Sequence, residues 1–266
     1  MSDKPINGKS DLNGSSESIS SGVGTSPGKS PRALTPWSWV PSLYFAEGLP
    51  YVAVTLLSIE IYMQMGLSDA QITFYTSWLY LPWVIKPFWS PFLDLFKTKR
   101  WWIVAMELLL GAAFAGVAFT IQTDFWLQGS ICFFWLMAFS SATHDVAADG
   151  FYMMGLEQHQ QAFFVGIRST FYRLSMIVGK GVLIMLAGVL QVIFRYQIRF
   201  SWGLIFYALT GIFIAFYLYH NFVLPRPDED VYHDENKSAV DVLNGFVETF
   251  VSFFRKDQLL VAVLFM

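Results

Sequence analysis

Long apolar stretches separated by short polar segments dominate the chain from about residue 37 onward. A membrane-spanning helix needs about 20 predominantly apolar residues, and six stretches reach that length. A seventh apolar run begins near residue 259 and stops at Met266, so we expect the natural sequence to continue beyond this point. The six expected spans cover residues 38–62, 70–96, 101–121, 125–153, 162–191 and 200–223.

Two polar regions flank the predicted six-span bundle, which occupies residues 37–223. Residues 1–36 are rich in Ser, Gly, Lys and Asp and carry few branched or aromatic residues, so we expect a disordered tail. Residues 224–257 form a linker that begins with prolines and acids. Apolar residues then recur at helical spacing between Val240 and Phe254, which predicts an amphipathic helix at the membrane interface. Residues 258–266 start the seventh span.

The distribution of Lys and Arg predicts the orientation of the spans. Basic residues concentrate in the tail, at residues 97–100 between the second and third spans, and after the sixth span. Cytoplasmic loops carry an excess of such residues, so we expect these three segments in the cytoplasm; Arg195 and Arg199 are exceptions on the opposite side. Six spans, a polar linker and a seventh span match the major facilitator fold, which packs two six-helix halves around a central site.

Composition agrees with this all-α membrane class. Hydrophobic residues make up 55% of the chain and charged residues only 14%, whereas soluble domains carry about 25% charged residues. The net charge of −3 and the absence of a basic patch give no indication of nucleic-acid binding. Cys132 is the single cysteine, which excludes an intrachain disulfide and a paired-cysteine metal site. We expect neither a cofactor nor a metal.

Eight charged residues fall inside the predicted spans, where they are costly and therefore usually face a cavity or a partner. All but one lie on the first, second, fourth and fifth spans, which line the central cavity in a major facilitator fold. Glu107, on the third span, is better interpreted as a contact between helices. The eight residues are Glu47, Lys86, Glu107, Asp145, Asp149, Arg168, Arg173 and Lys180.

The spacing of these charges suggests roles. Asp145 and Asp149 are four residues apart and share one helix face, and neighbouring carboxylates favour proton binding. Arg173 and Lys180 are seven apart, again on one face, which suits an anionic substrate group. The alternative is that the acids brace helix ends near a cytoplasmic gate and that the cations are only their counter-ions.

Glu47 and Lys86 lie on the first and second spans, and each has two interpretations. We expect both to contact substrate, although Glu47 could instead bind a proton or brace an irregular helix beside Gly48 and Pro50. Lys86 lies beside Pro87 and could be a satisfied charge at a kink. His144 is more simply a hydrogen-bonded histidine than a titrating group.

Three stretches in order resemble one transporter family. YFAEGLP at residues 44–50, LPWVIKPFWSPFLD at residues 81–94 and SATHDVAADG at residues 141–150 are similar to motifs of AmpG-type muropeptide permeases. The broader family includes acetyl-coenzyme A transporters of the endoplasmic reticulum. His144 departs from the Gln that is common there. Asp94 matches the acid of a degraded facilitator loop motif, which implies a role at the cytoplasmic gate.

The resemblance implies a secondary transporter in the cell inner membrane, coupled to protons, that brings anionic amphiphilic cell-wall fragments into the cytoplasm. Its partners would be the substrate, protons, the lipid bilayer and a second six-helix half beyond Met266. The first alternative is a transporter of acetyl-coenzyme A or another small anion. A membrane enzyme or sensor is an alternative of another class, but the sequence reveals no Ser/His/Asp constellation or cluster of metal ligands, so we expect no enzyme.

Overall fold

The computed structural model describes residues 35–90, 93, 97–227, 230, 244–245 and 247–248, and the regular structure within these ranges is helical throughout. Five helical segments among the described residues are long and apolar enough to cross a membrane. They correspond to the predicted first, third, fourth, fifth and sixth spans, which confirms the all-α membrane class. These segments are Pro36–Gln64, Lys99–Thr120, Trp126–Gly155, Gln158–Ile193 and Ile198–Val223.

The predicted second span differs from a continuous helix. It consists of α3 (Asp69–Ser77), a 3-10 turn (Trp78–Tyr80), α4 (Leu81–Ile85) and a second 3-10 turn (Lys86–Phe88). Pro82 and Pro87 lack the backbone N–H that a helix interior requires, and their rings crowd the preceding turn. The chain therefore tightens into 3-10 turns within the predicted second span, and Lys86 begins the second of them.

The first span is interrupted by a π-helical turn. It runs through α1 (Val40–Val52), the π turn (Ala53–Leu57) and α2 (Ser58–Gln64). The fifth span is built in the same way, from α8 (Gln158–Ile177), a π turn (Val178–Leu183) and α9 (Ile184–Ile193). The two π turns contact one another. Such turns add a residue to the helix and shift the faces on either side of it.

Small residues bring α1 and α8 into close contact. A Cβ atom placed on Gly48 would lie 1.8 Å from the Ser175 hydroxyl oxygen and 3.2 Å from the Tyr172 carbonyl oxygen. A Cβ atom on Gly179 would lie 2.5 Å from Val52 Cγ1. Gly179 lies in the π turn that follows α8, so glycine at these two positions lets the first and fifth spans approach closely, as small residues commonly do between membrane helices.

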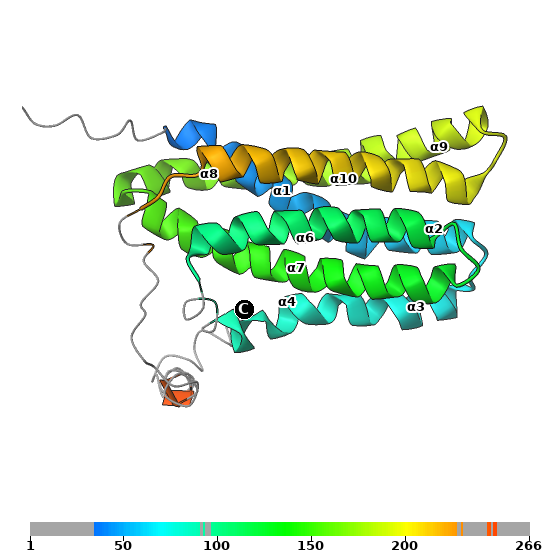
Figure 1. Cartoon of the computed structure of the whole chain (residues 1–266), viewed down its shortest axis with the longest axis horizontal. Helices are drawn as coiled ribbons and strands as arrows, with labels where there is room; N and C mark the ends of the chain where they lie inside the picture. Colours follow the sequence, from blue (N-terminus) through cyan, green and yellow to red (C-terminus); the bar gives the residue numbers. More distant parts are fainter. Residues whose placement is uncertain are drawn as a thin grey trace, which may run out of the picture. The chain divides into compact units, whose positions relative to one another are not determined.

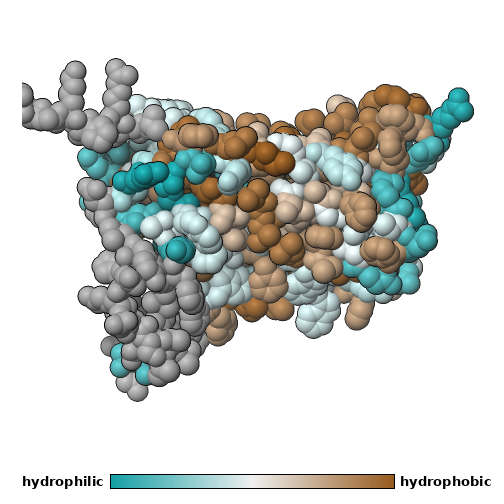
Figure 2. All heavy atoms as spheres, in the orientation of Figure 1, coloured by the Kyte–Doolittle hydropathy of each residue, from teal (hydrophilic) through white to brown (hydrophobic). Residues whose placement is uncertain are grey.

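The remaining spans are α6 (Lys99–Thr120), α7 (Trp126–Gly155) and α10 (Ile198–Val223), which lie side by side in Figure 1. α6 packs against both α7 and α10, while α1 packs against α7 and α8. Buried aromatic rings fill the space between α6, α7 and α10. In Figure 2, hydrophobic residues cover the middle of the visible face and hydrophilic ones gather toward its two ends. The rings include Phe114, Phe134, Phe206 and Phe213.

The linker after α10 returns to the start of α6. The Asp230 carboxylate accepts hydrogen bonds from the backbone N–H groups of Lys99 and Arg100, at 2.7 and 3.1 Å. Carboxylates are favourable at this position because the first N–H groups of a helix have no partner within it. The Arg100 side chain donates to the carbonyl oxygens of Leu224 and Asn221 at the end of α10. The start of α6 and the end of α10 are therefore joined.

Several sequence predictions lie outside the described residues. The tail up to residue 34, most of the predicted amphipathic helix and the start of the seventh span belong to this group, as does Asp94.

Candidate functional site

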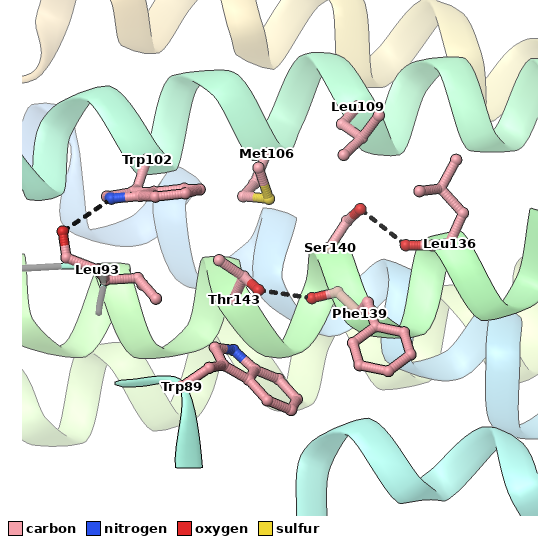
Figure 3. Close-up of a pocket in the computed structure, with 9 residues that line it drawn as sticks. All are labelled: Trp89, Leu93, Trp102, Met106, Leu109, Leu136, Phe139, Ser140 and Thr143. Atoms are coloured by element: carbon pink, nitrogen blue, oxygen red, sulfur yellow. Dashed lines mark hydrogen bonds between the residues drawn. The ribbon is translucent and has the colours of Figure 1, made fainter. Parts of the chain in front are cut away.

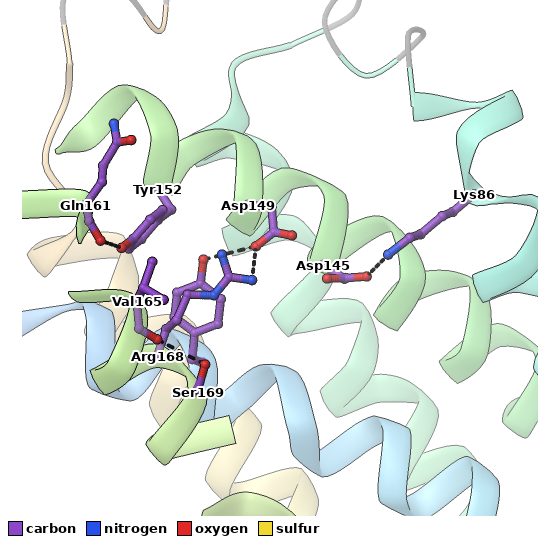
Figure 4. A network of polar contacts seen from close by, with 9 residues as sticks. Lys86, Asp145, Asp149, Tyr152, Gln161, Val165, Arg168 and Ser169 are labelled. Atoms are coloured by element: carbon purple, nitrogen blue, oxygen red, sulfur yellow. Dashed lines mark hydrogen bonds and ion pairs between the residues drawn. The ribbon is translucent and has the colours of Figure 1, made fainter. Parts of the chain in front are cut away.

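Charged side chains from four separate helical segments meet on one side of α7. Asp145 and Asp149 project from the same face of α7, as their spacing predicts. Lys86 reaches Asp145 from the 3-10 turn after α4, and Arg168 reaches Asp149 from α8 (Figure 4). Glu47 joins them from α1, and one oxygen of each of the three carboxylates lies within 4.8 Å of the others.

Asp149 forms the best-connected ion pair of this acid cluster, which we define as Glu47, Asp145 and Asp149. Arg168 Nη2 lies 2.8 Å from Asp149 Oδ1, and the Tyr44 hydroxyl donates to the same oxygen at 3.1 Å. The guanidinium carbon of Arg168 also stands 4.5 Å from the centroid of the Tyr44 ring and 5.4 Å from that of Tyr152. Arginine at such distances gains a cation–π attraction, so two aromatic rings help to hold Arg168.

Asp145 is neutralised by Lys86, whose Nζ contacts Asp145 Oδ2. The side chain of Asp145 is 15% exposed and that of Lys86 is 35% exposed. Because Lys86 belongs to the interrupted second span, the break at Pro82 and Pro87 brings a cation to α7.

Glu47 is the member of the acid cluster that forms no ion pair with a cation among the described residues. It is 9% exposed, and its Oε2 atom is buried without a hydrogen-bond partner. The cluster therefore brings three carboxyl groups together with two cations, Lys86 and Arg168. A buried charge without compensation is very costly, so the arrangement favours one additional positive charge beside Glu47.

A cavity of about 310 Å³ opens beside Glu47, between α1 and α8. Its walls combine two arginines with phenolic and hydroxyl groups, so it offers several donors and a single acid. This size falls within the range of about 300–1,000 Å³ that is typical of ligand sites. The lining residues are Tyr44, Glu47, Arg168, Ser169, Tyr172 and Arg173.

The acid cluster is also the group of described residues best placed to share a cation. Two of its carboxylates already face Lys86 and Arg168, which would repel a divalent metal ion. Its charge suits a single proton or a monovalent ion better than the hard divalent cations that collect several free carboxylates.

A second cavity, of about 320 Å³, lies between α6, α7 and the end of the second span (Figure 3). Its walls are almost entirely apolar, with Trp89, Trp102 and Phe139 among them. The Ser140 and Thr143 hydroxyls in its wall donate to carbonyl oxygens of their own helix, and Trp102 donates to Leu93. It therefore offers little polar recognition, and we place the candidate site at the acid cluster.

Comparison with known proteins identifies the family. The sequence profile of the BT1 family matches residues 45–266, which include every residue of the acid cluster. The chain belongs to the BT1 family. The anhydromuropeptide permease of Escherichia coli K12 is 29% identical to it over 150 residues, which make up 54% of the chain and 30% of the permease.

A second relative of this BT1-family chain is an uncharacterised protein of Schizosaccharomyces pombe. The two are 24% identical over 147 residues, or 49% of the chain and 28% of that protein. The matched part is thus less than a third of either relative's length. The family resemblance expected from the three motifs is confirmed, and the apolar helices agree with a multi-pass membrane protein.

Arg173 and Lys180, the two predicted substrate-binding cations of the fifth span, lie in different surroundings. Arg173 lines the cavity beside Glu47, whereas Lys180 is exposed within the π turn and is not among the lining residues. A spacing of seven puts two residues on one face only if the helix between them is a regular α-helix. The π turn that begins at Val178 changes the register, so the predicted stripe does not reach Lys180.

Glu107 forms the expected contact between helices. Its Oε1 atom lies 2.5 Å from His220 Nδ1 on α10 and 3.5 Å from His144 Nε2 on α7.

The sequence interpretation assigned no role to Arg168, Tyr44 or Tyr172 of this BT1-family chain. Tyr44 precedes Glu47 by three residues, a spacing that puts both on one helix face and was a usable signal.

Proposed function

We propose that the BT1-family chain belongs to a proton-coupled secondary transporter that carries an anionic, amphiphilic, muropeptide-like solute into the cytoplasm by alternating access. The observation that carries this proposal is the joint location of two arginines, two tyrosines and Glu47, whose Oε2 atom is buried without a hydrogen-bond partner, around one cavity. The proposed substrate class is the one for which the Escherichia coli relative, an anhydromuropeptide permease, is named. We propose no enzymatic activity.

Arg168 and Arg173 would bind the anionic part of the solute. Guanidinium groups form paired, charge-assisted hydrogen bonds with carboxylates and phosphates. Tyr44 and Tyr172 supply ring surface and hydroxyl groups for the less polar part. Lys86 lies on the other side of the acid cluster, bound to Asp145, so its proposed role is to balance charge near the path of the solute.

Proton coupling would follow from sharing Arg168. In the structure Arg168 neutralises Asp149 and also lines the cavity. An anionic solute that engages Arg168 would weaken its contact with Asp149, and the acid cluster would then have an excess negative charge. A proton on Glu47 or Asp149 restores the balance, so solute and proton would enter together. In this proposal Asp145 and Asp149 hold the cations Lys86 and Arg168 at the gate. Glu47, which pairs with neither cation, is then a binding site for the proton.

The second candidate is a transporter of acetyl-coenzyme A or another small anion. Two arginines at one cavity favour phosphate groups as well as carboxylates.

We further propose that the protein lies in the cell inner membrane with its N-terminus in the cytoplasm, and that a second six-helix half beyond Met266 completes the site. The pattern of basic residues supports this orientation.

The test is uptake by the full-length protein in proteoliposomes. We expect labelled anhydromuropeptide to accumulate under an inward proton gradient and unlabelled acetyl-coenzyme A not to compete. Arg173→Gln should weaken apparent affinity at least about tenfold, since a charge-assisted hydrogen bond contributes about 1.5–3 kcal/mol. Lys180→Gln, in the same span but away from the cavity, is the matched control. Competition by acetyl-coenzyme A would favour the second candidate, and absence of any uptake would refute the proposal.

A further inference from the structure

Four polar side chains from four helices meet in the core, apart from the acid cluster. Glu107 of α6 and His220 of α10 are fully buried, and His144 of α7 is 1% exposed. Besides its contacts with Glu107, His220 reaches Ser42 of α1, with Nε2 2.9 Å from the Ser42 hydroxyl oxygen. The network therefore joins α1, α6, α7 and α10 through a single buried carboxylate.

Ser42, His220 and Glu107 have the connectivity of a Ser–His–Glu triad, which the sequence does not reveal because 178 residues separate Ser42 from His220. Ser42 lies about 140° around the helix from Glu47, so it faces away from the cavity. None of the three is among the residues lining that cavity. A nucleophile needs access to substrate, so the chemistry available to this network is the binding of a proton.

The charge of Glu107 requires a partner inside the network. A carboxylate removed from water without compensation is very costly. Among the described residues, the titratable groups that face it are His144 from α7 and His220 from α10, while α1 contributes only the Ser42 hydroxyl. The nearby cations Lys86 and Arg168 pair with Asp145 and Asp149. One proton in the network restores neutrality. An imidazole is ordinarily a stronger base than a carboxylate, so we place that proton on a histidine and not on Glu107.

Hydrogen bonding selects His220 over His144. An imidazolium donates from both ring nitrogens and needs two acceptors. His220 has them, with Glu107 Oε1 at Nδ1 and Ser42 Oγ at Nε2. His144 has only a longer contact, with Nε2 3.5 Å from Glu107 Oε1, and its Nδ1 has no hydrogen-bond partner among the described residues. The Ser42 hydroxyl also lies 3.1 Å from the Trp39 carbonyl oxygen, to which it can donate while accepting from His220.

We propose that His220 is a proton-binding site sealed in the core, where its imidazolium joins the Glu107 carboxylate to the Ser42 hydroxyl. With the proton bound, α10 is fastened to α6 and to α1. Without this proton, Glu107 would lack its counter-charge and the Ser42 hydroxyl would donate to Nε2. The site is independent of the transport function proposed above.

Nitrogen NMR of the full-length protein tests this assignment. The protein would carry 15N-labelled histidine in lipid nanodiscs at pH 7, with signals assigned by single His→Gln substitutions. Exposed His159 is the internal reference. We expect both nitrogens of His220 to be protonated and His144 to carry one proton. Glu107→Gln should abolish the doubly protonated signal, whereas Glu157→Gln, which removes the exposed acid beside His159, should leave it unchanged.

The wild-type spectrum alone determines the protonation state, so the test holds even if Glu107→Gln fails to fold. A neutral His220 in the wild type, or a doubly protonated His144 in its place, would overturn the proposal. So would a doubly protonated His220 that survives Glu107→Gln in a folded protein.

Discussion

Arg168 lies 2.8 Å from Asp149 while its guanidinium also lines the cavity beside Glu47. One side chain therefore neutralises an intramembrane acid and is available to a bound anion. The two uses compete, because a guanidinium that turns toward an anion leaves Asp149 with less compensation. This relationship is the physical basis of the coupling proposed for the family member described here.

Arg168→Gln should impair transport more than Arg173→Gln, because it removes an anion ligand and also leaves Asp149 without its cation. We expect apparent substrate affinity to fall at least about tenfold, corresponding to the loss of a charge-assisted hydrogen bond. Arg168→Lys should recover part of the activity, since it keeps the charge but loses the fork geometry and much of the contact with Tyr44. Uptake measured against substrate concentration checks both results, and an Arg168→Gln protein with wild-type affinity would contradict them.

Lys86 and Asp145 should be energetically coupled. Lys86→Gln and Asp145→Asn each leave one charge without its partner, whereas the double substitution removes both charges. We expect the double variant to be more stable than the sum of the single effects predicts, by about 0.5–3 kcal/mol for groups in contact. The partial exposure of Lys86 favours the lower end of that range. Thermal unfolding of the four proteins in one detergent measures the coupling, and strictly additive effects would refute it.

Gly48 should tolerate no side chain. Gly48→Ala would bring a methyl group against the Ser175 hydroxyl and the Tyr172 carbonyl, and overpacking of this kind costs about 1–3 kcal/mol. Ser175→Ala in the same protein should recover part of the loss, since it removes the nearest atom. Gly166→Ala in α8 is the matched control, because no atom lies within 4 Å of a Cβ atom placed there. Equal unfolding temperatures for Gly48→Ala and Gly166→Ala would contradict the close packing of α1 on α8.

The spans that the sequence predicts best are those whose apolar runs contain no proline. The sixth span, predicted over residues 200–223, is the helix Ile198–Val223. The second was predicted as one span, with a kink at Lys86 as one interpretation, and it breaks into short helices and 3-10 turns around Pro82 and Pro87. Asp145 and Asp149 share a face because a spacing of four holds in any regular helix.

Other features of the site depend on geometry that spacing alone does not determine. The π turn beginning at Val178 has no sequence signature that we recognise, so the separation of Arg173 from Lys180 was missed. The contact between Ser42 and His220 joins the first and sixth spans, and a single sequence gives no information on which residues of distant helices meet. Arg168 was identified as an intramembrane charge, but its partner was not.

Glu47→Gln gives the most direct test of the central claim that a carboxyl group without its own cation takes up the proton that accompanies the anion. Uptake by full-length protein in proteoliposomes would be measured while the outside is acidified at constant internal pH, with solute exchange at equal pH as the control for folding and binding. We expect wild-type uptake to rise as the outside becomes more acidic, because protons then enter the outward-facing site more often. Glu47→Gln should exchange solute but lose this dependence and drive no proton movement. A Glu47→Gln protein that still accumulates solute in response to the proton gradient would contradict the account.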